Sequence, residues 1–226
     1  MKKLIIKNIM WDVDGVLANL DHAYFRLLKE HKNYKDKFKD LKWEDLPKAL
    51  PISPKFGTLE LTTHPTMGKQ LDEDFCNNSG DIYFDRPLYP QVAEVLTDLN
   101  NRGYTQLTMS SGFDAGTKKK MIQEALRGLD FIRIEVVEHI KKSSMIGEKE
   151  QRIRECLAKY NLNPEETVLV DDRIFNCETA LKIGMHAVRC TPGFTLPAPT
   201  DLKFDAEVKN VSEFRDWLLN NTITGL

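Results

Sequence analysis

Two short acidic segments of this sequence each follow a run of apolar residues. Asp12-Val13-Asp14 comes directly after Leu4–Trp11, and Asp171-Asp172 follows a second apolar run. An apolar run that ends in polar residues is typical of a buried strand in a parallel sheet, and ligands bind beyond the carboxyl ends of such strands. Like charges about 4 Å apart repel by roughly 4 kcal/mol at an effective dielectric near 20, so these carboxylates need a cation when they meet. Mg²⁺, which prefers hard oxygen ligands, is the expected ion, held by Asp12 with Asp171 or Asp172.

A third apolar run ends in hydroxyl groups. The run Gln106–Met109 is followed by Ser110-Ser111-Gly112. If the three strands share one sheet, these hydroxyl groups and the carboxylates converge on a single crevice. A Mg²⁺ ion in such a site typically keeps several waters and contacts a substrate phosphate, so the crevice is expected to bind phosphate.

The elements that would position these residues alternate along the chain. Short β-prone runs occur at Gln106–Met109, Ile132–Val137, Thr167–Val170 and Ala187–Cys190, with helical patterns near 117–127, 148–160 and 176–183 between them. This alternation predicts right-handed crossovers and a parallel sheet. The expected fold is therefore of the α/β class, a Rossmann-like parallel sheet flanked by helices.

Residues 20–85 interrupt this pattern. The segment begins with helical spacing over Leu20–Leu28 and then holds four prolines between positions 47 and 65, which prevent any long regular element. We expect residues 1–19 and 86–226 to form the catalytic core, and residues 20–85 to form an inserted, mainly helical cap domain.

The amino-acid composition argues against some classes of binding partner. The 226 residues carry a formal net charge of −2, with 41% hydrophobic and 29% charged residues, as in ordinary globular proteins. No global positive field is available to hold a nucleic acid polymer or an anionic membrane. The four cysteines show no C-x-x-C pairing and the N-terminus shows no signal-peptide core, so a cytoplasmic location is expected.

The strand-end motifs together resemble those of the haloacid dehalogenase (HAD) superfamily of phosphatases and phosphotransferases. Ile9–Val16 looks like the first motif of this family, a hydrophobic strand followed by D-x-D-G-[TV], Leu107–Gly112 looks like the second motif, and Val168–Asp172 looks like the acidic fourth motif. The resemblance covers the chain except most of residues 20–85, where the family places a helical cap that contributes much of the substrate choice. It implies that Asp12 is the nucleophile and Asp14 the general acid/base.

The resemblance also implies which residues bind phosphate. Ser110 would bind the phosphoryl group, with Ser111 beside it, and Gly15 would let backbone amides approach the phosphate closely. The third motif of the family is a lysine, for which Lys149, 23 residues before Asp172, is the first candidate and Lys142 the alternative.

Metal ligands follow from the same comparison. The continuation Arg173-Ile174-Phe175-Asn176 is similar to the D-D-x-x-x-N branch of the family. This similarity implies that Asp172 contacts the metal directly and that Asp171 supports it. The backbone carbonyl of Asp14, rather than its side chain, would complete the protein ligands.

The implied activity is Mg²⁺-dependent hydrolysis of a small phosphomonoester, a sugar phosphate or a nucleoside monophosphate, through an aspartyl-phosphate. Dehalogenases of the superfamily lack the second aspartate of the first motif, so the presence of Asp14 favours phosphoryl transfer. Two alternatives remain open: a phosphomutase or phosphotransferase of the same superfamily, and a non-catalytic binding protein that keeps the fold.

Two further patterns are interpreted without a functional role. The sequence D-x-D-G also begins calcium loops, but an EF-hand needs Gly at position 6 and Glu at position 12, where this chain has Leu17 and Ala23. The run Lys118–Lys120 is interpreted as a solvated helix face rather than an anion-binding patch, because the net charge is near zero.

Overall fold

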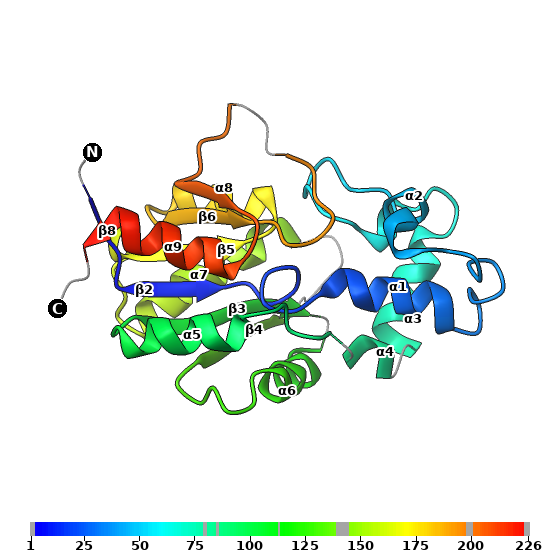
Figure 1. Ribbon diagram of the computed structural model, residues 1–226, viewed down its shortest axis with the longest axis horizontal. Coiled ribbons are helices and arrows are strands. Elements are labelled where there is room, and N and C mark those ends of the chain that lie inside the picture. Colours follow the sequence, from blue (N-terminus) through cyan, green and yellow to red (C-terminus); the bar gives the residue numbers. More distant parts are fainter. Residues whose placement is uncertain are drawn as a thin grey trace.

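A parallel sheet forms the centre of the molecule. The computed structural model describes residues 3–78, 81–84, 86–112, 114–138, 145–197 and 201–223. The sheet has the strand order β4-β3-β2-β5-β6-β7, and every pair in it is parallel (Figure 1). Its strands are β2 (Asn8–Trp11), β3 (Thr105–Gly112), β4 (Arg133–Glu138), β5 (Thr167–Asp171), β6 (His186–Cys190) and β7 (Ala206–Val208).

The position of β2 in the middle of the sheet follows from its sequence. All four of its residues are buried, as expected for a strand that is covered on both faces. It pairs with β3 on one side and with β5 on the other, so Trp11 lies opposite Thr108 and Val170. The residues that follow these three strands therefore meet at one edge.

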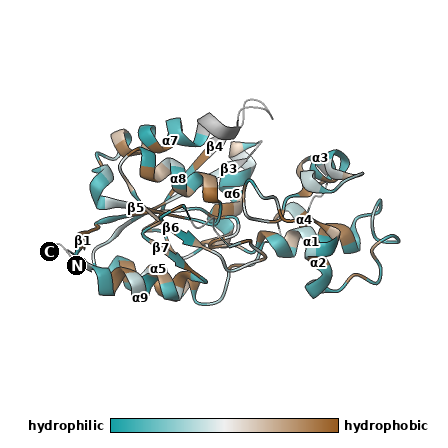
Figure 2. Ribbon diagram, turned by 90° about the horizontal axis from the view of Figure 1, so that it is seen from above, coloured by the Kyte–Doolittle hydropathy of each residue, from teal (hydrophilic) through white to brown (hydrophobic). Residues whose placement is uncertain are grey.

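In the part of the chain that the structure describes, five helices cover the two faces of the sheet. The helices α5 (Val92–Asn101), α6 (Ala115–Ala125) and α9 (Val211–Asn221) contribute to one buried apolar cluster, and α7 (Met145–Lys159) and α8 (Ile174–Lys182) contribute to a second. In Figure 2, α5 and α9 lie on one side of the sheet and α7 and α8 on the other, each with polar residues toward solvent. The predicted α/β class is confirmed.

The inserted segment lies beyond the carboxyl ends of the strands (Figure 1). It contains the helices α1 (Leu20–Glu30), α2 (Leu46–Ala49), α3 (Gly68–Asn78) and α4 (Asp81–Phe84), with short 3-10 turns at Trp43–Asp45 and Leu61–Thr63. A third apolar cluster, separate from those of the sheet, runs from Ala23 to Ile82 through these elements. Side chains of the segment therefore pack mainly on one another and form a roof above the strand ends.

Two details differ from the sequence-based expectations. The first apolar run is divided into β1 (Leu4–Ile5), which pairs with β8 (Thr222–Ile223), and β2. Strand β7 was not predicted, because it has only three residues and lies at the sheet edge.

Among the described residues, no helix has the length and apolar character needed to cross a membrane.

Candidate functional site

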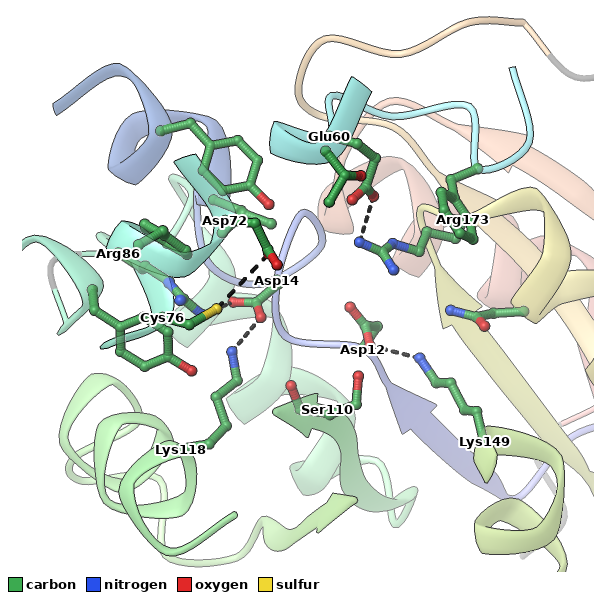
Figure 3. A pocket seen from close by; sticks show the side chains of 18 residues that line it. Asp12, Asp14, Glu60, Asp72, Cys76, Arg86, Ser110, Lys118, Lys149 and Arg173 are labelled. Atoms are coloured by element: carbon green, nitrogen blue, oxygen red, sulfur yellow. Dashed lines mark hydrogen bonds and ion pairs between the residues drawn. The ribbon is translucent and has the colours of Figure 1, made fainter. Parts of the chain in front are cut away.

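A cavity of about 210 Å³ lies between the strand ends and the inserted segment. Its floor includes Asp12, Ser110 and Ser111 from the sheet, and Lys149 from α7. Its opposite wall comes from the insertion and includes Tyr24 and Phe75. Figure 3 shows the carboxylates, hydroxyls and cationic side chains of both parts pointing into this one space.

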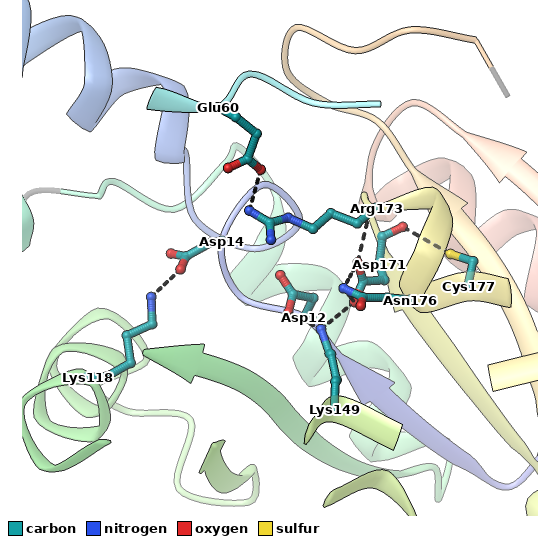
Figure 4. Close-up of polar contacts among 9 residues, drawn as sticks. All are labelled: Asp12, Asp14, Glu60, Lys118, Lys149, Asp171, Arg173, Asn176 and Cys177. Carbon is teal, nitrogen blue, oxygen red and sulfur yellow. Dashed lines mark hydrogen bonds and ion pairs between the residues drawn. The ribbon is translucent and has the colours of Figure 1, made fainter. Parts of the chain in front are cut away.

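Asp12 is held at the end of β2 by the sheet and by a lysine. Its backbone N–H donates to the carbonyl of Val170 at 2.9 Å, which continues the ladder between β2 and β5. Lys149 Nζ donates to Asp12 Oδ1 at 2.7 Å and to Asp171 Oδ2 at 2.6 Å (Figure 4). Lys149 thus bridges the two carboxylates that the sequence places at neighbouring strand ends. Lys142, the alternative for the third motif, lies outside the described residues.

Asp171 and Asp172 have different surroundings. The carboxylate of Asp171 is fully buried and accepts hydrogen bonds from Lys149, from Asn176 Nδ2 and from the backbone N–H of Arg173. In contrast, Oδ1 of Asp172 is buried without any hydrogen-bond partner in the described part of the chain. A buried carboxylate oxygen without a donor is costly, and a cation would satisfy it.

These aspartates form a compact acidic group. Oxygen atoms of Asp12, Asp171 and Asp172 lie within 4.8 Å of one another, which suits a hard divalent cation. Burial, together with the neighbouring carboxylates, raises the pKa of Asp12 to about 7 although Lys149 opposes the shift. Burial and the charges of Asp171 and Asp12 likewise raise the pKa of Asp172 well above its usual range. The group therefore carries more negative charge than Lys149 balances.

Gly15 and Arg189 shape the backbone around Asp172. Gly15 has a φ of +83°, and a Cβ atom there would lie 2.1 Å from Asp172 Oδ2, so only glycine allows the loop to pass this carboxylate. Arg189 is buried and donates from Nε to the backbone carbonyl of Asp172 at 3.1 Å. Both residues fix the place of Asp172 at the strand end.

Asp14 points away from the acidic group toward two cations. Arg86 Nη1 donates to Asp14 Oδ1 at 2.6 Å, and Lys118 Nζ donates to Asp14 Oδ2. Burial opposes ionisation of Asp14, but Arg86 and Lys118 outweigh it and hold the pKa of Asp14 well below its usual range. Only the backbone carbonyl of Asp14 is left for the metal role that the resemblance implies.

The interpretation of Lys118–Lys120 as a solvated face is wrong for Lys118. Its side chain is 1% exposed, whereas Lys119 and Lys120 are exposed. Burial, with Arg86 nearby, lowers the pKa of Lys118 to about 8. The sequence did contain a signal, because Lys118 is spaced with the buried Met121 and Ile122 of α6 at i, i+3 and i+4, which puts it on the inner face of the helix.

Arg173 ties the inserted segment to the core. Its Nη2 donates to Glu60 Oε1 at 2.5 Å, and its guanidinium lies over the ring of Phe56, 4.9 Å from the centroid. The backbone adds two hydrogen bonds: Ile174 N–H donates to Phe56 O at 3.2 Å, and Leu196 N–H donates to Gly57 O at 2.9 Å. Residues 56–60 of the insertion are therefore fixed to the strand ends.

Of the predicted site residues, the structure places Asp12, Asp14, Ser110, Ser111 and Lys149 around one cavity, whereas Gly15, Asp171 and Asp172 do not line it. Ser110 and Ser111 lie at the end of β3, on the floor beside Asp12 (Figure 3). Sequence patterns did not assign the following residues to the cavity wall: Tyr24, Phe56, Glu60, Asp72, Phe75, Cys76, Tyr83, Arg86, Lys118 and Arg173. Most of them come from the insertion, whose sequence after Leu28 carries no periodic pattern that would indicate which side chains point inward.

Comparison with known proteins agrees with this geometry. A family model described as haloacid dehalogenase-like hydrolase matches residues 6–184. A predicted phosphatase from Clostridium acetobutylicum has 18% identity and a TM-score of 0.64, over 96% of this chain and 99% of that chain. CbbY from Rhodobacter sphaeroides, in complex with phosphate, has 14% identity and a TM-score of 0.59, over 92% of this chain and 96% of that chain.

A third similar structure is that of YfnB from Bacillus subtilis bound to magnesium. It has 14% identity and a TM-score of 0.63, over 96% of this chain and 99% of that chain. At these identities the structural similarities show the fold alone, and no curated protein matches the sequence. The family match, however, spans most of the chain and includes the strand ends from Asp12 to Asp172, so the protein belongs to the haloacid dehalogenase-like hydrolases.

Proposed function

We propose that this hydrolase is a Mg²⁺-dependent phosphatase that acts on a small phosphomonoester through an aspartyl-phosphate. The observation that carries the proposal is the buried group of Asp12, Asp171 and Asp172, with Lys149 bound to two of them and one oxygen of Asp172 left without a donor. This combination supplies a nucleophile, a cation for phosphate oxygens and a place for a metal ion.

The acidic group fits a divalent cation, which in this proposal is held by Asp12, Asp172 and the backbone carbonyl of Asp14. Asp171 orients Lys149 instead, because its oxygens already accept from Lys149, Asn176 and the Arg173 backbone. When bound, Mg²⁺ would draw in a phosphate group and balance the negative charge that develops on it.

Asp12 would attack phosphorus in line with the leaving oxygen, so that a carboxylate–phosphorus bond forms as the ester bond breaks. Because Arg86 and Lys118 keep Asp14 ionised in the free protein, Asp14 would take up a proton when the substrate binds and give it to the leaving oxygen. It would then take a proton from the water that attacks the aspartyl-phosphate. The second step releases inorganic phosphate and regenerates Asp12. Lys149, Ser110 and nearby backbone N–H groups would stabilise the charge on the phosphoryl oxygens.

The size of the cavity favours a small substrate. Its volume of about 210 Å³, below the roof made by the insertion, suits a metabolite rather than a polymer. Aromatic side chains on the roof, among them Tyr24 and Phe75, face the place where the leaving group would lie. A sugar phosphate and a nucleoside monophosphate are both compatible with this wall, and inserted residues rather than core residues would select between them.

The experiment is hydrolysis of p-nitrophenyl phosphate with Mg²⁺, with EDTA, and by Asp12→Asn. We expect activity that requires both Mg²⁺ and Asp12, since hydrolysis of this substrate depends on the residues at the strand ends and needs few specific contacts with the insertion. The matched control is Asp98→Asn. It removes the carboxylate of the ion pair between Asp98 and Arg102 at the end of α5, outside the site. Equal rates for the wild type and Asp12→Asn would reject the mechanism, and transfer of the phosphoryl group to a sugar but not to water would indicate a mutase.

A further inference from the structure

The surroundings of Asp14 contain more positive charge than this carboxylate balances. Arg86 and Lys118 both bind it, and their side chains are 2% and 1% exposed. In addition, Arg86 Nε is buried and has no hydrogen-bond acceptor among the described residues. Two buried cations on one carboxylate leave a surplus positive charge, and such a charge is costly unless an anion arrives to pair with it.

Of the two cations, Arg86 is the more firmly held. Its guanidinium lies over the rings of Tyr83 and Phe75, at 4.5 and 5.3 Å from their centroids. A flat guanidinium between aromatic rings keeps one orientation. Lys118 has a flexible four-carbon chain and a compact ammonium group, so it is the cation that can change partner.

Lys118 also lies where a phosphoryl group would enter. It belongs to the first turn of α6, whose N-cap Asp114 follows shortly after Ser110-Ser111 at the end of β3. The positive end of the helix adds to the attraction for an anion at this point. Lys118, Ser110 and Asp12 line the same cavity (Figure 3).

We propose that Lys118 is a second phosphoryl-binding lysine, which pairs with Asp14 in the free protein and transfers to a phosphoryl oxygen when the substrate binds. This inference rests on the proposed function. Lys149 and Lys118 then hold the phosphoryl group from opposite sides. The change of partner also frees one oxygen of Asp14 to face the leaving group, while Arg86 continues to orient the other.

The test compares Lys118→Met with Lys119→Met, because Lys119 is the next residue of the same helix and is exposed. Binding of inorganic phosphate in the presence of Mg²⁺ is measured by calorimetry, and kcat and KM are measured for p-nitrophenyl phosphate. We expect Lys118→Met to weaken phosphate binding by about 10- to 100-fold, as for the loss of a buried charged hydrogen bond, and to raise KM. Lys119→Met should match the wild type.

Two results would overturn the inference. If Lys118→Met binds phosphate as tightly as the wild type while kcat falls, Lys118 only orients Asp14. If Lys118→Met does not fold, Asp14→Asn provides the second test: it leaves both cations unpaired and should bind phosphate at least as tightly as the wild type, so weaker binding contradicts the partner exchange. Failure of the wild type itself to bind or release phosphate would instead reject the proposed function.

Discussion

The two halves of the site are built from the same kinds of side chain in opposite proportions. On one side, Asp12, Asp171 and Asp172 lie close together, and Lys149 binds two of them, Asp12 and Asp171. On the other side, the single carboxylate of Asp14 is shared by Arg86 and Lys118 (Figures 3 and 4). The first half has surplus negative charge and the second has surplus positive charge, although both are buried. The buried charges of the site are thus separated into a negative and a positive half at adjacent positions.

The largest expected effect comes from removing the one negative charge of the positive half. Asp14→Asn should lower turnover of p-nitrophenyl phosphate by about 10²–10⁴-fold, the usual contribution of general acid–base catalysis. Because the variant retains the shape of the side chain, binding of substrate should persist. Steady-state kinetics of Asp14→Asn beside Asp98→Asn provides the measurement, and turnover near that of the wild type would show that another group handles the proton.

Removing a cation should affect the stability of the two halves unequally. Lys149→Met leaves Asp12 and Asp171 without their shared partner, and the loss of one member of a buried ion pair costs about 3–5 kcal/mol. Lys118→Met leaves Asp14 still paired with Arg86, so its cost should be clearly smaller. Urea unfolding in EDTA measures the free energy of unfolding of both variants. Addition of Mg²⁺ should restore part of the stability of Lys149→Met. Equal losses for the two variants would contradict the charge asymmetry.

A smaller effect is expected where the loop passes the negative half. Gly15→Ala would place a Cβ atom 2.1 Å from Asp172 Oδ2 at a φ of +83°, so we expect weaker metal binding and a stability loss of about 1–3 kcal/mol. Gly103→Ala is the matched control, because Gly103 has a φ of +85° but nothing within 4 Å of the added atom. Electron paramagnetic resonance measures the Mn²⁺ affinity of both variants, and we expect a lower affinity for Gly15→Ala than for Gly103→Ala. Equal metal affinity would show that Asp172 does not hold the ion.

The smallest effect is expected at a balanced pair remote from the site. His186 Nδ1 lies 3.1 Å from Asp205 Oδ1, and both side chains are 21% exposed. The hydrogen bond from Asp205 raises the pKa of His186, while the pKa of Asp205 is lowered because His186 and a backbone N–H outweigh its burial.

The sign of the pH dependence follows from these directions. The contribution of His186 is complete below its unfolded pKa of about 6.5 and is lost as the pH rises through the folded value, and that of Asp205 is present above about 3.9. We expect His186→Asn to cost up to about 1 kcal/mol between these values and less at pH 8.5. Urea unfolding at pH 5.5 and 8.5 measures this difference. A cost as large as that of Lys149→Met would show that burial does not set the strength of the pairs in the site.

The central part of the fold could be predicted because its strands are short apolar runs that end in polar residues. For β2, β3 and β5, this pattern located both the strand and the residues at its carboxyl end. The division of the first run into β1 and β2 could not be predicted, since it depends on pairing with β8 at the other end of the chain. Strand β7 has too few residues for an apolar pattern to be recognised.

The acidic half of the site could also be predicted, whereas most of the positive half could not. Asp12, Asp171 and Asp172 are adjacent to apolar runs, so local sequence predicts where they lie. Arg86 is not, because it follows the insertion and its position depends on Tyr83 and Phe75 in the folded segment. The burial of Lys118 was predictable from its helical spacing, but its charge favoured the interpretation that it is exposed to solvent. The structure shows that its side chain is buried.

The central place of β2 in the sheet determines when the site can form during synthesis. Met10 lies beside Leu107 and Leu169, partners that are made about a hundred or more residues later. Nascent Asp12 therefore has no completed strand end until Asp172 has left the ribosome, and contacts so distant in sequence form slowly. The apolar cluster of the insertion draws almost entirely on residues 20–83 and can collapse much earlier. The roof of the cavity is thus available before its floor, and hydrolytic competence arises only after β5 and Asp172 have been made.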